Sequence, residues 1–261
     1  MKRLLALYFL SAFLVLNYAQ EYPEKGKNYD VQIYDYLLTL TNEAPLDTFL
    51  TYSKPFSKWD IRPLYRDKIW VFDTIYTAGE IPNFIWGAIA AKYNITLKAG
   101  KDFPNLFLKK GIDKRSDNIN ILKDNLSKFE EITEKIQSGD NHFFVNQKSM
   151  QRIDEIYRED NRYWKYMIPS DSPFPISDGT ITTIDITFSE SQNQILDLLK
   201  ELNIYCAVKT TKGIFYLIDG FTDNSYGFYF SREGKMENDN FLFHILASEK
   251  IVPKYFYYVA N

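Results

Sequence analysis

The sequence predicts an α+β protein, in which a helical N-terminal region is followed by a mixed, mainly antiparallel sheet with one βαβ-like unit in the C-terminal half. The first observation concerns residues 203–230, where β-branched and aromatic stretches alternate with Gly, Asp, Asn and Ser. This pattern is typical of successive strands joined by turns. It predicts strands over residues 204–209, 214–219 and 226–230. The second observation is apolar residues three and four positions apart over residues 116–138, which predict an amphipathic helix.

The first 19 residues have the features of an export leader. Lys2 and Arg3 form a short basic segment, residues 4–16 are apolar, and a cut before Gln20 leaves a polar N-terminus. The apolar run is shorter than the roughly 20 residues that a membrane-spanning helix needs. We therefore expect residues 1–19 to be removed as a signal peptide, and we expect no membrane span in the remaining chain.

The cysteine content indicates the compartment. Cys206 is the only cysteine, so the chain cannot form an internal disulfide. A secreted eukaryotic protein of this size usually carries several disulfides. Together with the leader, this predicts export to the bacterial periplasm or to the extracellular medium.

The region after the leader is predicted to be mainly helical. Apolar residues at helical spacing predict a helix over residues 29–40. A second helix over residues 81–93 begins with a proline in its first turn and is apolar on nearly all sides, which is typical of a buried helix. Between them, prolines indicate loops with one short helix over residues 46–52. Residues 69–76 fit either a short strand or a buried helix.

The helix over residues 116–138 is followed by a predicted boundary. Gly139 suits the left-handed position that follows many helix ends. We expect a mainly helical region over residues 20–140 and an α+β region with the central sheet over residues 141–261. The alternative is that both regions form one compact domain.

The second region contains the βαβ-like unit. Residues 148–158 fit a further helix, and residues 184–188 alternate apolar and polar side chains as in a strand with one wet face. Ser189 and Gln192 form a capping-box pair that begins a helix, and the strand at residue 204 follows. This strand–helix–strand order is long enough for a parallel crossover. Further strands are predicted over residues 241–246 and 255–259.

Charge and ligand spacing exclude several classes of partner. The net charge is −3, and removal of the two cations Lys2 and Arg3 changes it to −5. No predicted element carries a basic cluster of the kind on which nucleic-acid binding relies, so nucleic acid is not expected as a partner. The chain has two histidines and one cysteine at no metal-binding spacing, and we expect no metal and no cofactor.

Catalytic patterns are weak. Cys206 lies between apolar residues in the middle of a predicted strand, which favours a packing role over a nucleophile. No nucleophile elbow or phosphate-binding glycine loop occurs. A hydrolytic carboxylate pair is defined by distance in space, which sequence spacing does not give. Asp219, at the end of a predicted central strand, is the best single carboxylate.

The loop that follows this strand is the candidate site. Asp219, Asp223 and Asn224 offer acceptors beside Tyr226, or alternatively Asp223 or Asn224 closes the turn by bonding backbone N–H groups. With the high content of Tyr and Phe, this favours an exported, non-catalytic binding protein for a protein partner or a surface glycan. The alternatives are a periplasmic hydrolase that acts through carboxylates and an inhibitor- or immunity-type partner of a secreted enzyme. No oligomeric state is predicted.

Overall fold

The structure is a computed structural model that describes residues 29–43, 49–58, 60, 69–71, 74–76, 80–93, 95, 97–148, 150–165, 186–221, 223–238, 240 and 242–261. The predicted leader lies outside these residues. The helices are α2 (Asp30–Glu43), α3 (Phe49–Tyr52), α4 (Glu80–Lys92), α5 (Leu97–Asp113), α6 (Arg115–Asp124), α7 (Leu126–Ser138) and α8 (Glu190–Glu201). The strands are β1 (Ile69–Val71), β2 (Thr74–Tyr76), β3 (Phe143–Asn146), β4 (Gln151–Ile153), β5 (Ile156–Glu159), β6 (Arg162–Lys165), β7 (Cys206–Lys209), β8 (Gly213–Phe221), β9 (Asn224–Ser231), β10 (Ile245–Val252) and β11 (Tyr255–Ala260).

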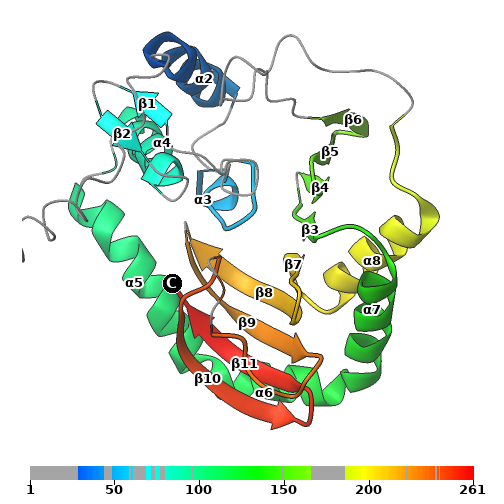
Figure 1. The fold of residues 1–261 in the computed structure, drawn as a ribbon. Coiled ribbons are helices and arrows are strands. Elements are labelled where there is room, and N and C mark those ends of the chain that lie inside the picture. The colour runs from blue at the N-terminus through cyan, green and yellow to red at the C-terminus, as the bar shows by residue number, and fades with distance from the viewer. Residues whose placement is uncertain are drawn as a thin grey trace, which may run out of the picture.

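A single nine-stranded sheet dominates the C-terminal half (Figure 1). Its strand order is β10-β11-β9-β8-β7-β3-β4-β5-β6, and every neighbouring pair is antiparallel. The α+β class and the helical N-terminal region are thereby confirmed. The expectation of a mixed sheet is wrong for the described residues, because no pair of their strands runs parallel.

The predicted βαβ-like unit is not confirmed either. Ile186, Thr187 and Phe188 precede α8 without forming a strand, and the earlier part of that predicted strand lies outside the described residues. Helix α8 instead connects β6 at one edge of the sheet with β7 near its middle. The capping box is confirmed, since the Ser189 side chain accepts from the Gln192 backbone and the Gln192 side chain accepts from the Ser189 backbone.

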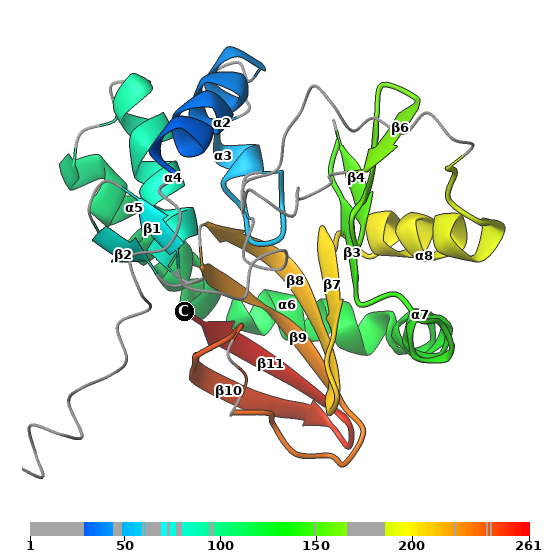
Figure 2. The same cartoon turned by 45° about the horizontal axis from the view of Figure 1, so that its top comes forward.

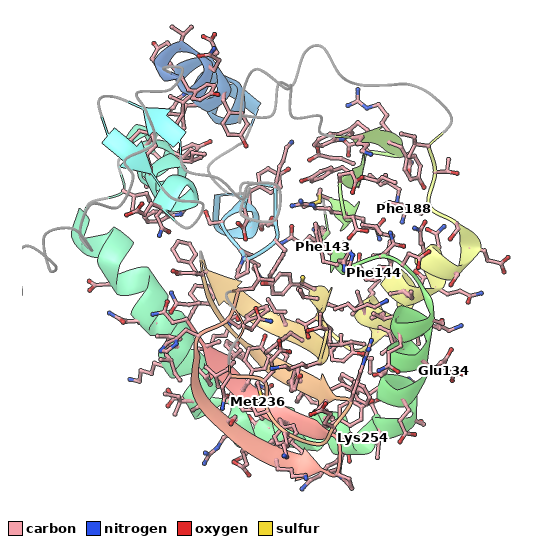
Figure 3. All side chains as sticks on the ribbon, viewed as in Figure 1. Glu134, Phe143, Phe144, Phe188, Met236 and Lys254 are labelled. Atoms are coloured by element: carbon pink, nitrogen blue, oxygen red, sulfur yellow. The ribbon has the colours of Figure 1, made fainter. Side chains whose placement is uncertain are left out.

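The two faces of the sheet are covered by different elements. Helices α6, α7 and α8 pack on face 1, where Phe129, Ile132 and Leu199 join a buried apolar cluster (Figure 2). Face 2 is covered by the residues after α3, whose Phe56 is buried in a second cluster. The neighbours Phe143 and Phe144 of β3 belong to the two different clusters, as the two-residue alternation of a strand requires (Figure 3).

The N-terminal helices form a third cluster at the end of β8. Ile33 of α2 and Ile89 of α4 are buried together, and Phe221 from the last position of β8 joins them. Phe107 of α5 stacks on Phe221 with ring centroids 5.5 Å apart, and the Trp86 ring meets it edge-on at 5.4 Å. The helical region therefore packs directly against the sheet.

Several local predictions need correction. Residues 148–158 form most of the β4–β5 hairpin and no helix among those described, because their apolar side chains alternate between the two faces. The helix over residues 116–138 is two helices, α6 and α7, separated at Asn125 with φ −119° and ψ 25°. Gly139 ends α7 in an extended conformation (φ −90°, ψ 168°), so the predicted left-handed stop is wrong.

The structure decides the one segment that the sequence left open between strand and helix. Residues 69–76 contain the short hairpin β1–β2, which decides between strand and helix. Helix α5 has no counterpart among the predicted elements. No helix in the described ranges is both long and apolar enough to cross a membrane.

Candidate functional site

The predicted site loop is shorter than expected because β8 continues past Asp219. In the β8–β9 register, Leu217 pairs with Gly227 and Asp219 pairs with Tyr226, so Ile218 is the extra residue of a β-bulge. Strand β8 then runs to Phe221 and β9 begins at residue 224. The connection is two residues long, and Asp219 lies within a strand.

Asp219 joins two N-terminal segments to the sheet. Its Oδ1 lies 2.7 Å from the Lys54 ammonium, and its Oδ2 accepts from the Lys110 ammonium of α5 at 2.6 Å. The Gly220 backbone N–H also donates to Oδ1 at 3.0 Å. One carboxylate therefore holds both α5 and the residues after α3 at the end of β8.

These contacts determine what Asp219 can do chemically. Burial by itself would raise the pKa of the Asp219 carboxyl, but the two lysine charges and their hydrogen bonds lower it below its ordinary value. The carboxylate is ionised at neutral pH, and both of its oxygens already accept from a neighbour. This arrangement is typical of an ion pair that fixes structure, whereas a general acid requires a raised pKa.

We expect Asp219→Asn to lower the free energy of unfolding by about 2 kcal/mol at pH 7, since hydrogen bonds to charged groups contribute roughly 1.5–3 kcal/mol. The folded-state pKa is lowered, so the contribution is complete above the unfolded pKa of about 3.9 and disappears as the pH falls through the folded pKa. Urea melts of both proteins at a series of pH values measure this. A difference that stays constant between pH 7 and pH 2 would contradict it.

The other three predicted site residues, Asp223, Asn224 and Tyr226, differ in their contacts. Asn224 is buried, and its Nδ2 donates to the half-buried Asp223 Oδ1 at 3.2 Å. Tyr226 is 2% exposed and packs against Gly111 of α5, where an added Cβ would lie 2.8 Å from the tyrosine Cβ. The structure brings Asp219 and Tyr226 together as cross-strand partners. The role of these four residues in binding stays a prediction.

Residues 51–58, which we call the strap, comprise the end of α3 and the turns that follow it, near the end of β8 (Figures 1 and 2). Its tip reaches β8 through Lys54 and Asp219, while both of its ends return to Glu159 of β5. The anchoring contacts are Tyr52 Oη to Glu159 Oε1 (2.6 Å), Lys58 Nζ to Glu159 Oε2 (3.1 Å), Ser57 Oγ to Gln147 Oε1 (2.9 Å), Gln147 Nε2 to Thr51 O (3.1 Å) and Tyr205 Oη to Pro55 O (3.4 Å). The anchors thus extend across five neighbouring strands, from β8 to β5, and each of them is a polar contact.

Arg152 of β4 lies beneath the strap and is fully buried. Its Nε donates to Asp154 O at 2.7 Å, and its Nη1 donates to the strap carbonyls of Phe56 (3.1 Å) and Ser57 (3.5 Å). The rings of Phe143 and Tyr157, from the strands on either side of β4, lie 4.5 and 4.8 Å from the guanidinium carbon. The guanidinium is therefore held by carbonyls and rings, and no carboxylate of the described residues forms an ion pair with it.

Cys206 is buried on face 2, as the sequence predicts. Burial raises the pKa of its thiol well above the ordinary value, the Arg152 charge lowers it and the Asp60 charge raises it. The neutral thiol is a weak nucleophile. Cys206 belongs to one transverse row of paired residues across face 2, which consists of Trp164, Tyr157, Arg152, Val145, Cys206, Leu217, Gly227, Tyr258 and Ser248.

The tyrosines of the sheet are mostly internal. Thr133 Oγ1 on α7 lies 2.7 Å from Tyr216 Oη and 3.0 Å from Tyr255 Oη, and Tyr257 Oη donates to Gly111 O at 2.6 Å. Burial raises the pKa of Tyr255 to about 12. These hydroxyls connect the helices to face 1, which accounts for part of the high tyrosine content.

Sequence reasoning missed Arg152 and the two lysines that pair with Asp219. No sequence signal marks them, since Lys110 lies 109 residues and Lys54 lies 165 residues (219 − 54) from Asp219 along the chain, and Arg152 bonds only to backbone carbonyls. In the described part of the chain, no three His, Cys, Asp or Glu side chains gather in a way that suits a metal ion. Comparison of the chain with protein-family models, with curated proteins and with solved structures finds no match to any of them.

Proposed function

We propose that the chain is an exported, non-catalytic binding protein that contacts a protein partner or a surface glycan. The outer side of α2 supports this most directly. Val31 and Tyr34 lie one turn apart on this helix and are 69% and 58% exposed, whereas Ile33 and Tyr36 on the inner side are buried. Tyrosine is one of the residue types enriched among the anchors of protein interfaces.

The geometry of Asp219 favours binding over the alternative of a carboxylate-dependent hydrolase. Its two oxygens are engaged by the Lys54 and Lys110 ammonium groups, so the best carboxylate candidate has a structural task in this arrangement. An inhibitor- or immunity-type role belongs to the same class as our proposal, because it also acts through a contact surface.

Site-specific photo-crosslinking in the host tests this proposal. A photoreactive phenylalanine analogue at position 34 is expected to capture one defined macromolecule, and the same analogue at the exposed Lys200 position of α8 is expected to capture none. Tyr34→Ser should then weaken binding of the identified partner about 30-fold, the factor that corresponds to a 2 kcal/mol hot spot. Equal capture at both positions, or unchanged affinity of Tyr34→Ser, would contradict the assignment of the α2 surface.

A further inference from the structure

The conformation of the strap is unusual at its tip. Phe56 has φ +62°, in the left-handed region that bulky side chains rarely adopt, although its ring is buried among the aromatic residues of face 2. Strained backbone persists only when the surrounding contacts hold it in place. The strap is held by the polar anchors described above and by the Phe56 ring, which packs against Phe143 and Phe243. Loss of the polar anchors would therefore remove one of the two sets of contacts that keep the strained backbone in place.

The second unusual feature is the charge of Arg152. A fully buried guanidinium normally forms a hydrogen-bonded ion pair with a carboxylate, because an uncompensated charge is unfavourable in the interior. Glu155 lies within electrostatic range of Arg152, and the buried Asp60 accepts from the Phe56 N–H of the strap at 2.8 Å, but neither carboxylate hydrogen-bonds to the guanidinium. Arg152 Nη2 is buried and donates no hydrogen bond, while Nη1 donates only to the strap carbonyls of Phe56 and Ser57. Nη1 and Nη2 form one edge of the guanidinium, and the strap carbonyls bond only to Nη1. Such an edge commonly binds an oxyanion through two parallel hydrogen bonds.

We propose that Arg152 is the centre of a carboxylate-binding site that the strap closes, with a planar carboxylate replacing the carbonyls of Phe56 and Ser57. The rings of Phe143 and Tyr157 flank the guanidinium at 4.5 and 4.8 Å. These rings contact the guanidinium itself, so a ligand binds along its edge in the place of the two carbonyls. A flat carboxylate needs less room there than a tetrahedral phosphate.

Binding and strap opening are coupled in this arrangement. The carboxylate and the strap carbonyls compete for the same donors, so any change that loosens the strap must strengthen carboxylate binding by the same factor. Cys206 reports opening, because it is the only cysteine and is buried beside Tyr205, whose hydroxyl bonds to Pro55 of the strap. The site does not depend on the proposed partner surface of α2.

The test measures the rate at which a thiol reagent labels Cys206 in the native full chain, with benzoate, benzamide, inorganic phosphate and chloride at equal ionic strength. Benzoate is expected to increase the rate with saturation, and the other three additives are expected to leave it unchanged. Arg152→Lys keeps the positive charge but removes the pair of parallel N–H donors. Half-saturation of this variant should require about tenfold more benzoate.

The same labelling experiment on Gln147→Ala is a second test, which leaves Arg152 intact and changes no charge. It removes the anchors to Ser57 and Thr51, so basal labelling should rise and half-saturating benzoate should fall by the same factor. Tyr255→Phe, which loses a hydroxyl contact on face 1, is the control for general destabilisation and should leave the benzoate response unchanged. A wild-type rate insensitive to benzoate, an equal response to phosphate or benzamide, or an unaltered benzoate response in Gln147→Ala would each overturn the proposal.

Discussion

Gly227→Ala is expected to lower the free energy of unfolding by about 3 kcal/mol or more, at the upper end of the range for overpacked sites. A Cβ at this position would lie 1.9 Å from the Tyr216 carbonyl oxygen and 3.0 Å from the Ile218 nitrogen. Both atoms belong to the backbone of the neighbouring strand β8, at the bulge that places Asp219 opposite Tyr226. No side-chain rotation relieves such a contact, so one of the two central strands must move.

The matched control is Gly87→Ala in α4. Nothing lies within 4 Å of a Cβ added there, and alanine is preferred over glycine inside a helix. This variant should gain about 0.5–1 kcal/mol in the same urea melts. If Gly227→Ala instead unfolds within 1 kcal/mol of wild type, the register of β8 against β9 at the bulge is different from the one described.

The helical elements follow from the sequence where local signals agree. Helix α2 follows from apolar spacing alone, α4 is marked by a proline in its first turn, and the capping box of α8 forms as its residue types require. Helix α5 was missed because it contains Pro104 and two glycines, which disfavour a helix interior. The burial of Phe107 against Phe221 and the bond from Lys110 to Asp219 stabilise it through tertiary contacts.

Strands β3 to β6 could not be predicted from periodicity within their own segments. Strands β3, β4, β5 and β6 are three or four residues long, too short for alternation to be distinguished from helical spacing. They join the rest of the sheet through β3, whose pairing with β7 depends on contacts between residues about 60 positions apart, such as Val145 and Cys206. Periodicity within one segment carries no information about such a partner.

The candidate site shows the same limit. Asp219 stands out in the sequence because it follows an apolar strand, and the structure does give it a special environment. Its environment depends on Lys54 and Lys110, whose proximity is a result of tertiary packing. The sequence therefore identified Asp219 as a residue of interest, but it did not show the ion pairs that determine its chemistry.

The second large effect is expected at Arg152. Arg152→Ala should lower the free energy of unfolding by about 4 kcal/mol, because a large side chain is removed from a buried position and the strap carbonyls of Phe56 and Ser57 lose their donor. The loss of the ring contacts with Phe143 and Tyr157 adds to this effect. Urea melts with the exposed Arg162→Ala on β6 as the control, expected within about 0.5 kcal/mol of wild type, measure it.

Arg152→Met separates the two causes. Methionine fills much of the same volume without a buried charge, so it removes the cavity effect and the unfavourable desolvation of the guanidinium while leaving the three carbonyl acceptors without their donor. We expect a loss of about 2 kcal/mol, roughly half that of alanine, from lost hydrogen bonds to a charged group. A methionine variant as stable as wild type would mean that the guanidinium contributes no net stability by holding the strap. Arg152 would then have no net stabilising role, which agrees with the carboxylate-binding proposal.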